Sequence, residues 1–159
     1  MSERKFVIVD GSSLLSTCYY AVLPREIMFA KTDEEKEKHY GKILHASDGT
    51  YTNGIMGVLK AVVSLLKKQQ PAYVAFVFDK TRDTFRRELY PDYKGTRSRT
   101  PEPLKQQFVL MERILEEAGF KVLYSDRYEA DDYVFIGTTG ISSAIGRKEH
   151  QCLSAGTQR

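Results

Sequence analysis

The sequence predicts an α/β fold built around a mostly parallel β-sheet. Three short apolar runs, at residues 6–9, 73–78 and 121–124, are typical of buried parallel strands. Amphipathic helical patterns separate these runs. A helix of about 20 residues between two strands favours parallel pairing through a right-handed crossover. Ligands of such sheets bind at the carboxyl ends of the strands, so the residues that follow each run are the first place to look for a site.

The first strand leads through Asp10-Gly11 into a helix, as at the start of a βαβ unit. Ser12 or Ser13 is expected to cap this helix and Pro24 to end it. Neither G-x-G-x-x-G nor G-x-x-x-x-G-K-[ST] follows, so a Rossmann dinucleotide site or a P-loop has no support. The lack of an Asp-x-Asp arrangement also argues against a phosphatase with an aspartyl intermediate. The apolar positions of the helix are Leu14, Leu15, Cys18, Tyr19 and Val22.

Residues 24–52 form a longer connection. Its charged run, residues 31–38, is expected to be a short exposed helix with mixed-sign ion pairs and no chemistry, and residues 47–50 a turn. Thr52-Asn53 then offers an N-cap for a strongly amphipathic helix that ends at Gln69-Gln70-Pro71. The apolar stripe of this helix contains Ile55, Val58, Leu59, Val62, Leu65 and Leu66.

The second strand ends at Asp79, and a basic segment follows it. Residues 80–105 contain eight Lys or Arg and four Asp or Glu, whereas the rest of the chain is nearly neutral and the net charge is +3. Aromatic residues lie among these cations, a composition that suits base stacking and phosphate pairing. Proline and glycine interrupt the segment, so we expect a mobile, partly helical excursion outside the core. The alternative is a merely soluble loop.

A further helix is predicted from Thr100-Pro101-Glu102 to Gly119, and the third strand then leads to the densest group of acids in the chain, Glu129, Asp131 and Asp132. Carboxylates crowded in this way repel one another and call for cations, either Lys and Arg or a hard divalent metal. The alternative is an acidic first helical turn that needs no metal. Acids at all three strand ends favour a site. In the helix predicted between Thr100 and Gly119, the apolar positions are Leu104, Phe108, Met111, Leu115 and Ala118.

Composition restricts the class of protein. A chain of 159 residues is expected to form one domain with a real core. No apolar run approaches the roughly 20 residues of a membrane span and no signal-like region opens the chain, so we expect a cytoplasmic protein. Cys18 and Cys152 lie far apart without histidines at ligand spacing, which argues against structural zinc. His39, His45 and His150 are isolated and are expected to be solvated.

The last segment differs in character. No aromatic residue follows Phe135, and Gly, Ser and Thr give residues 136–159 a loose composition. We expect this segment to be a divergent, poorly ordered tail.

Six motifs occur along the chain in this order: Val9-Asp10-Gly11, Thr52-Asn53-Gly54, Phe78-Asp79, Phe85-Arg86, Tyr93-Lys94-Gly95-Thr96-Arg97 and Glu129-Ala130-Asp131-Asp132. Taken in order, they resemble the N-terminal half of 5'-3' exonucleases, the metal-dependent nuclease domain of bacterial DNA polymerase I and of stand-alone flap endonucleases. The resemblance covers about residues 5–133. It implies a three-layer α/β sandwich with a mostly parallel sheet, PIN-like or resolvase-like and here incomplete at its C-terminus. The implied domain is 1–135, with 80–101 as a basic arch or clamp.

The resemblance also implies a metal-dependent 5'-3' exonuclease or 5' flap endonuclease acting on DNA phosphodiester bonds. Two Mg²⁺ or Mn²⁺ ions serve the intact family, and Lys94 matches the cation that neutralises charge in the transition state. DNA with 5' ends or 5' flaps is the implied partner, a DNA polymerase a further candidate, and the bacterial nucleoid the implied location. The implied metal ligands are Asp10, Asp79, Glu129, Asp131 and Asp132; the implied DNA-binding residues are Arg86, Tyr93, Lys94 and Arg97.

The sequence departs from the family pattern near Tyr133. The family continues with a Thr-Gly-Asp-x-Asp loop for the second metal and a helix-hairpin-helix-like element that grips duplex DNA, whereas no aspartate follows Asp132 here. We therefore expect a truncated, frame-shifted or fragmentary member with one surviving metal site and exposed apolar surface. Two alternatives are an inactive nucleic-acid-binding fragment of the family and an unrelated α/β domain whose acids cap helices.

Overall fold

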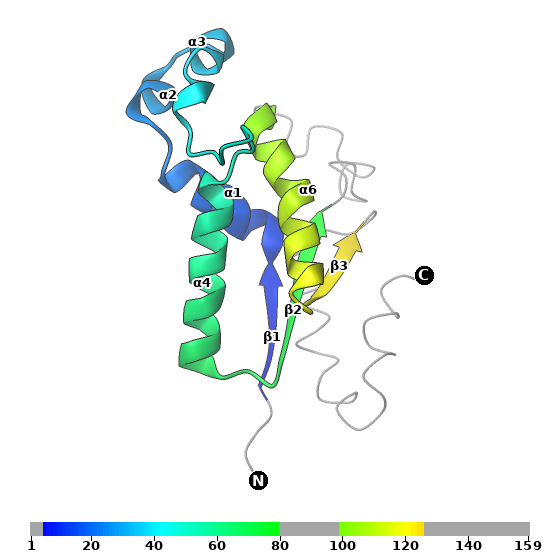
Figure 1. Ribbon diagram of the computed structural model, residues 1–159. Helices are drawn as coiled ribbons and strands as arrows, with labels where there is room; N and C mark the ends of the chain where they lie inside the picture. The colour runs from blue at the N-terminus through cyan, green and yellow to red at the C-terminus, as the bar shows by residue number, and fades with distance from the viewer. Residues whose placement is uncertain (1–4, 80–98, 126–159) are drawn as a thin grey trace, which may run out of the picture. The chain divides into compact units, whose positions relative to one another are not determined.

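A computed structural model describes residues 5–79 and 99–125 of the chain (Figure 1). The chain divides into two compact units. The sheet unit holds the three strands and the turn into the first helix, and the helical unit holds the remaining helical segments. In chain order the elements are β1 (Phe6–Asp10), α1 (Gly11–Ala21), α2 (Arg25–Phe29), α3 (Asp33–Glu37), the 3-10 helix η1 (Tyr40–Lys42), α4 (Asn53–Gln69), β2 (Tyr73–Asp79), α6 (Glu102–Glu117) and β3 (Lys121–Ser125).

The three strands form one parallel sheet in the order β1-β2-β3, as Figure 1 shows by arrows that run in the same direction. The central strand is β2, and residues 75–78 within it are buried. A strand covered on both faces needs a nearly continuous apolar run, which is the pattern of this segment. The predicted α/β class with a parallel sheet is confirmed.

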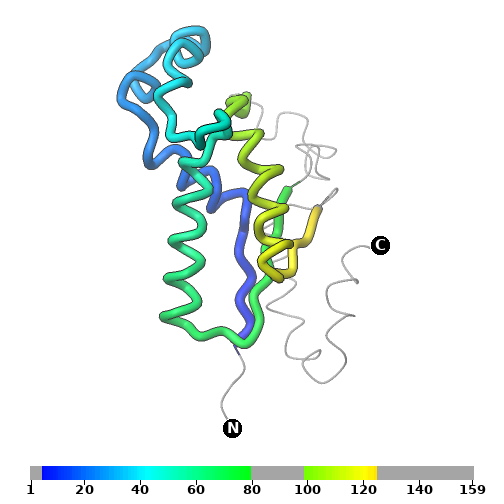
Figure 2. The backbone as a smooth tube through the Cα atoms, in the orientation of Figure 1, coloured from blue at the N-terminus to red at the C-terminus, as the bar shows by residue number. Residues whose placement is uncertain are grey.

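In the helical unit, two glycines of α4 allow α1 to approach closely. A Cβ on Gly57 would lie 2.7 Å from the Cβ of Cys18, and one on Gly54 would lie 3.0 Å from Cδ1 of Leu15. On another side α4 contacts α6, and Figure 2 shows the backbones of the two helices next to each other. Apolar residues of the predicted α4 stripe supply the burial: Ile55, Val58 and Val62 are all buried.

A buried amide pair joins the start of α4 to α6. Gln107 and Asn53 are only 0% and 2% exposed. The Oε1 of Gln107 accepts hydrogen bonds from the backbone N–H groups of Gly54 (2.8 Å) and Ile55 (3.3 Å), and its Nε2 donates to Oδ1 of Asn53 (2.8 Å). Gln107 therefore caps α4 from another helix. The pair also donates to two backbone carbonyls, those of Pro103 and Tyr19.

This arrangement corrects the predicted cap of α4. Thr52 does occupy the N-cap position, but its side chain makes no capping hydrogen bond to any part of the chain that the structure describes. The reason is that the amide oxygen of Gln107 already accepts from the free N–H groups of the first turn, which a helix cannot satisfy by itself.

The start and end of α1 also differ from the prediction. Gly11 is already helical, so Ser12 and Ser13 lie in the first turn and the expected serine cap is wrong. At the other end the helix stops at Ala21, and Val22 lies outside it with 59% of its surface exposed. The residues before Pro24 are disfavoured in helical conformation, which explains why the predicted apolar stripe is too long.

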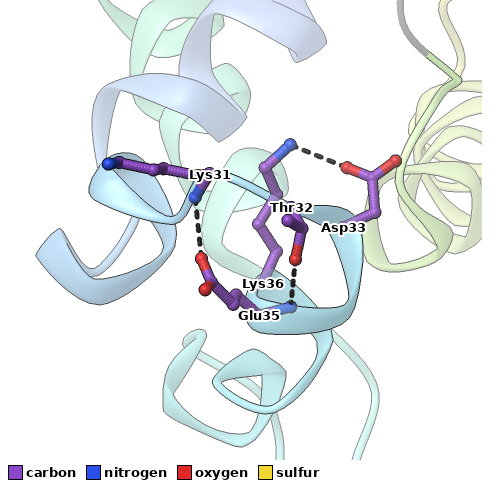
Figure 3. Close-up of polar contacts among 5 residues, drawn as sticks. All are labelled: Lys31, Thr32, Asp33, Glu35 and Lys36. Carbon is purple, nitrogen blue, oxygen red and sulfur yellow. Dashed lines mark hydrogen bonds and ion pairs between the residues drawn. The ribbon is translucent and has the colours of Figure 1, made fainter.

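The connection between α1 and α4 contains the predicted short charged helix, α3. Figure 3 shows how it is held. The Thr32 hydroxyl accepts the N–H of Glu35 (3.2 Å), and the Glu35 carboxylate accepts the N–H of Lys31 (2.9 Å). This closely resembles a capping box. One mixed-sign pair, Lys36 with Asp33 at 2.7 Å, adds to it as expected.

Other predicted boundaries are confirmed. Residues 47–50 form a turn in which Oδ1 of Asp48 accepts the N–H of Thr50 (2.9 Å). Two helices end at left-handed residues, α4 at Gln70 (φ 44°) and α6 just before Gly119 (φ 85°). No helix among the described residues is long and apolar enough to cross a membrane. The predictions for residues 80–98 and for the tail at 136–159 lie outside the described residues.

Candidate metal centre

Asp10 and Asp79 lie at the carboxyl ends of neighbouring parallel strands. Asp10 is the last residue of β1, and its Cα partner on β2 is Val77. Asp79 lies two residues further along β2, and residues two apart on a strand share one face. Because paired residues of neighbouring strands also share a face, Asp10 and Asp79 are presented on the same face at the same edge of the sheet.

The environment of this pair suits a cation. Asp10 is half-buried and Asp79 is exposed. Two carboxylates at one edge of a sheet repel each other, so a positive charge between them lowers the electrostatic free energy. Carboxylate oxygens are hard donors, the kind of ligand that Mg²⁺ and Mn²⁺ prefer.

The turn between β1 and α1 fits tightly against the end of β2. A Cβ on Gly11 would lie only 2.5 to 2.8 Å from three ring atoms of Phe78, a residue that is 1% exposed. Real Cβ atoms do not come so close to other heavy atoms. A larger residue directly after Asp10 would therefore have to displace either this turn or the buried ring of Phe78.

Ser12 connects the same turn to Asp79 itself. Its Oγ accepts a hydrogen bond from the backbone N–H of Asp79 at 3.0 Å. The two residues are 67 positions apart in the sequence. The chain that carries Asp10 is thus bonded to the backbone that carries Asp79.

The other predicted site residues lie outside the described part of the chain. Three of them are the acids of the cluster after β3, and four belong to the basic segment after β2. The structure therefore brings together two of the nine predicted residues and gives no position for the rest. Those without a described position are Glu129, Asp131, Asp132, Arg86, Tyr93, Lys94 and Arg97.

The donor set fits a hard divalent cation. No group of three or more His, Cys, Asp or Glu side chains within residues 5–79 and 99–125 is placed to hold a metal. What the described residues offer is a pair of carboxylates. Mg²⁺ keeps several of its waters and is commonly bound through one or two protein carboxylates together with substrate phosphates, so such a pair is a suitable part of its ligand set.

A thiol and an imidazole among the described residues lie on other parts of the chain. Cys18 is a free thiol packed against α4, and burial raises its pKa. His45 is exposed, and its Nδ1 lies 2.7 Å from the carbonyl of Ile43. Neither residue belongs to a group of three or more potential metal ligands within the described ranges.

Sequence reasoning missed the roles of Ser12, which bonds to the backbone of Asp79, and of Gln107, which caps α4. Ser12 was expected to cap a helix, and nothing in a local pattern indicates a partner 67 positions away. Gln107 offered a better signal. It lies three residues after Leu104 and four before Met111, so a polar residue stands in the buried stripe of α6.

The chain matches the family described as 5'-3' exonuclease, N-terminal resolvase-like domain, over residues 5–152. It belongs to that family. The matched span includes both Asp10 and Asp79 and extends beyond residue 133, where the predicted resemblance ended. The predicted family is confirmed.

Relatives among characterised proteins carry matching names. A 5'-3' exonuclease of Aquifex aeolicus is 36% identical over 131 residues, which are 82% of this chain and 39% of that protein. DNA polymerase I of Geobacillus stearothermophilus is 31% identical over 132 residues, 83% of this chain and 13% of the polymerase. DNA polymerase I of Streptococcus pneumoniae strain R6 is 30% identical over 134 residues, which are 84% of this chain and 14% of that polymerase. The chain thus spans well under half the length of these relatives.

Solved structures support the fold. A structure described as divalent metal ions (zinc) bound to T5 5'-exonuclease superposes with a TM-score of 0.53 at 21% identity. The match covers 87% of this chain and 45% of the T5 protein. At this level of identity the similarity shows the fold, and it confirms the predicted PIN-like, resolvase-like α/β class.

Proposed function

We propose that this chain is the nuclease domain of a 5'-3' exonuclease or flap endonuclease, and that it hydrolyses DNA phosphodiester bonds with a divalent metal. Family membership supports the reaction class. The observation that carries the proposal is the pair of Asp10 and Asp79, on one face at the carboxyl edge of a parallel sheet. Ligands of open α/β sheets bind at this edge.

In this proposal Asp10 and Asp79 hold the cation together with Glu129, Asp131 and Asp132. The metal named for the T5 structure supports a divalent ion. We propose Mg²⁺ or Mn²⁺ because an all-carboxylate set is typical of these ions, whereas zinc sites are rich in histidine and cysteine. When bound, such ions lower the pKa of a water that attacks the phosphate and stabilise the leaving oxygen.

The basic segment supplies the remaining parts of the proposed mechanism. Lys94 neutralises negative charge that grows on the phosphate in the transition state. Arg86 and Arg97 pair with neighbouring phosphates, and the ring of Tyr93 stacks on a base of the single strand. The protein therefore contributes negative charge to hold the cation and positive charge to hold the DNA.

DNA with a free 5' end or a 5' flap is the substrate that we propose. The relatives named DNA polymerase I support an association with a polymerase. We propose the bacterial cytoplasm, at the nucleoid, as the place of action. In that setting the nuclease would remove 5' ends during replication and repair.

The experiment that tests this function uses 5'-labelled flap DNA and the purified chain in Mn²⁺, in Mg²⁺ and in EDTA. We expect cleavage in either metal and none in EDTA. Asp10→Asn and Asp79→Asn remove one negative charge each without changing side-chain size. Each is expected to lower the cleavage rate by more than about 100-fold, because metal stabilises both the attacking and the leaving oxygen.

The matched control is Asp33→Asn, which makes the same change on the exposed helix α3 and is expected to leave cleavage unaltered. Equal cleavage by all three variants would point to a contaminating nuclease. Folded protein that binds DNA in a salt-dependent way but never cuts it would instead support the binding-only alternative and end the enzyme proposal for this chain.

A further inference from the structure

The β1–β2 ladder ends before β2 does. Asp10, the last residue of β1, pairs with Val77, so β2 continues for two residues past the end of its neighbour. On its other side Asp79 still pairs with β3, at Ser125. The proposed ligand Asp79 is therefore paired with a residue of β3 but lies beyond the last residue of β1 that pairs with β2.

Ser12 provides the missing support on the β1 side. Its hydroxyl oxygen accepts the backbone N–H of Asp79 at 3.0 Å, two residues after Asp10 and within the first turn of α1. The bond adds one more rung to the ladder after β1 has turned into a helix. A side chain thus takes the place that a strand carbonyl would otherwise occupy.

Gly11 makes the approach of Ser12 sterically feasible. Because position 11 has no Cβ, the turn rests directly on the ring of Phe78, the residue before Asp79. Two adjacent contacts, Gly11 on Phe78 and Ser12 on Asp79, hold the turn against the end of β2. Movement of the Asp79 backbone relative to Asp10 would break one or both of them.

We propose that Ser12 is a positioning residue for the metal centre, because through the N–H of Asp79 it sets the spacing of the Asp79 and Asp10 carboxylates. This inference rests on the proposed metal-dependent function. Mg²⁺ demands nearly ideal octahedral geometry, so a small displacement of one ligand weakens binding. Loss of residues that orient metal ligands typically costs about 10- to 100-fold in affinity or activity.

The test measures Mn²⁺ binding by the metal-free chain, with free Mn²⁺ followed by electron paramagnetic resonance, so that no cleavage is needed. Ser12→Ala removes the acceptor and is expected to weaken Mn²⁺ binding about 10-fold. In NMR spectra of the metal-free protein, the amide proton of Asp79 should shift upfield and exchange faster. Ser16→Ala is the matched control, since it makes the same change one turn further along α1 and leaves the Ser12 bond in place.

Ser12→Thr keeps the hydroxyl and is expected to restore both readouts, whereas Ser12→Cys offers a weaker acceptor and should fall between Ser and Ala. The Cys and Thr variants carry the test if Ser12→Ala does not fold. Unchanged Mn²⁺ affinity in a folded variant whose Asp79 amide has shifted would overturn the inference, because the bond would then be structural only. Absence of Mn²⁺ binding in the wild-type chain would overturn the proposed function itself, and with it the inference.

Discussion

At the scale of single residues, the hydroxyl of Tyr19 is an unusual feature of the core. The side chain is 0% exposed, and its hydroxyl has no hydrogen-bond partner among the described residues. Burial, and to a smaller extent Tyr40, Tyr20 and Tyr51 nearby, raises the pKa of Tyr19. A buried hydroxyl that has lost its water and gained no partner destabilises the folded state.

Tyr19→Phe is therefore expected to stabilise the protein. Removal of the unpaired hydroxyl should raise the free energy of unfolding by about 1 kcal/mol, measured by urea unfolding near pH 7. Tyr20→Phe, at a neighbouring position that is 47% exposed, is the control and should change stability very little. A loss of stability in Tyr19→Phe would mean that the hydroxyl has a partner.

The same variant gives a pH test with a definite sign. The folded state keeps the Tyr19 proton to a higher pH than the unfolded chain, whose tyrosines titrate near pH 10. The free energy of unfolding is therefore unaffected by this titration below about pH 10, and it falls as the pH rises from there through the folded pKa of Tyr19, because the unfolded chain releases the proton first. Melting midpoints between about pH 8 and 11 should fall more steeply for the wild type than for Tyr19→Phe. Parallel curves would contradict the assignment.

At the scale of elements, the start of α4 depends on a residue of α6. The first N–H groups of a helix need an acceptor, and here a buried glutamine supplies it to Gly54 and Ile55. The same side chain bonds to Asn53 at 2.8 Å. The start of α4 is thus coupled to α6 through one side chain.

Gln107→Leu tests this dependence. It keeps approximate size but leaves two N–H groups and one amide oxygen buried without partners, so we expect the free energy of unfolding to fall by about 2 to 4 kcal/mol. Urea unfolding measures the change. Gln106→Leu, the adjacent exposed position, should cost less than about 0.5 kcal/mol. If both variants lost a similar amount of unfolding free energy, the hydrogen bonds of Gln107 to the start of α4 would not be what stabilises the protein.

Local patterns explain which elements were predictable. The strands and the long helices α4 and α6 each carry their periodicity within consecutive residues, so β2 and the ends at Gln70 and Gly119 could be predicted. The pairing of Asp10 with Val77 and the bond from Asp79 to Ser12 could not. These contacts depend on register between distant segments. The positions of Asp10 and Asp79 at strand ends were predictable from the apolar runs that precede them, while the contacts of Ser12 and Gly11 with the end of β2 were not.

At the scale of the whole molecule, the residues proposed to bind DNA and those proposed to bind metal carry opposite charges. Eight Lys and Arg residues lie between positions 80 and 105, whereas the proposed metal ligands are all acids. Binding to a nucleic-acid backbone releases condensed cations and therefore weakens as salt rises. The proposed DNA binding is thus expected to weaken with rising salt and to persist without metal, whereas the proposed cleavage requires the metal.

We expect the chain to bind labelled single-stranded DNA in EDTA with an affinity that falls as KCl rises, measured by fluorescence anisotropy. Lys94→Ala should reduce the slope of log K against log[KCl] by about 1, because the proposed contact of Lys94 with a phosphate would be lost. Lys67→Ala, at the C-terminal end of α4, is the control and should leave the slope unchanged. Equal effects of the two variants would show that only total charge matters.

The long sequence separation between the paired strands has a consequence for folding. β1 and β2 meet through residues 67 positions apart, as do Ser12 and Asp79. Contacts of such high order form slowly, because a long loop must close before any of them stabilises the chain. The two aspartates are therefore brought together only once this late pairing has formed. A nascent or partly folded chain therefore lacks the Asp10 and Asp79 pair, so the proposed metal centre is complete only in the native topology.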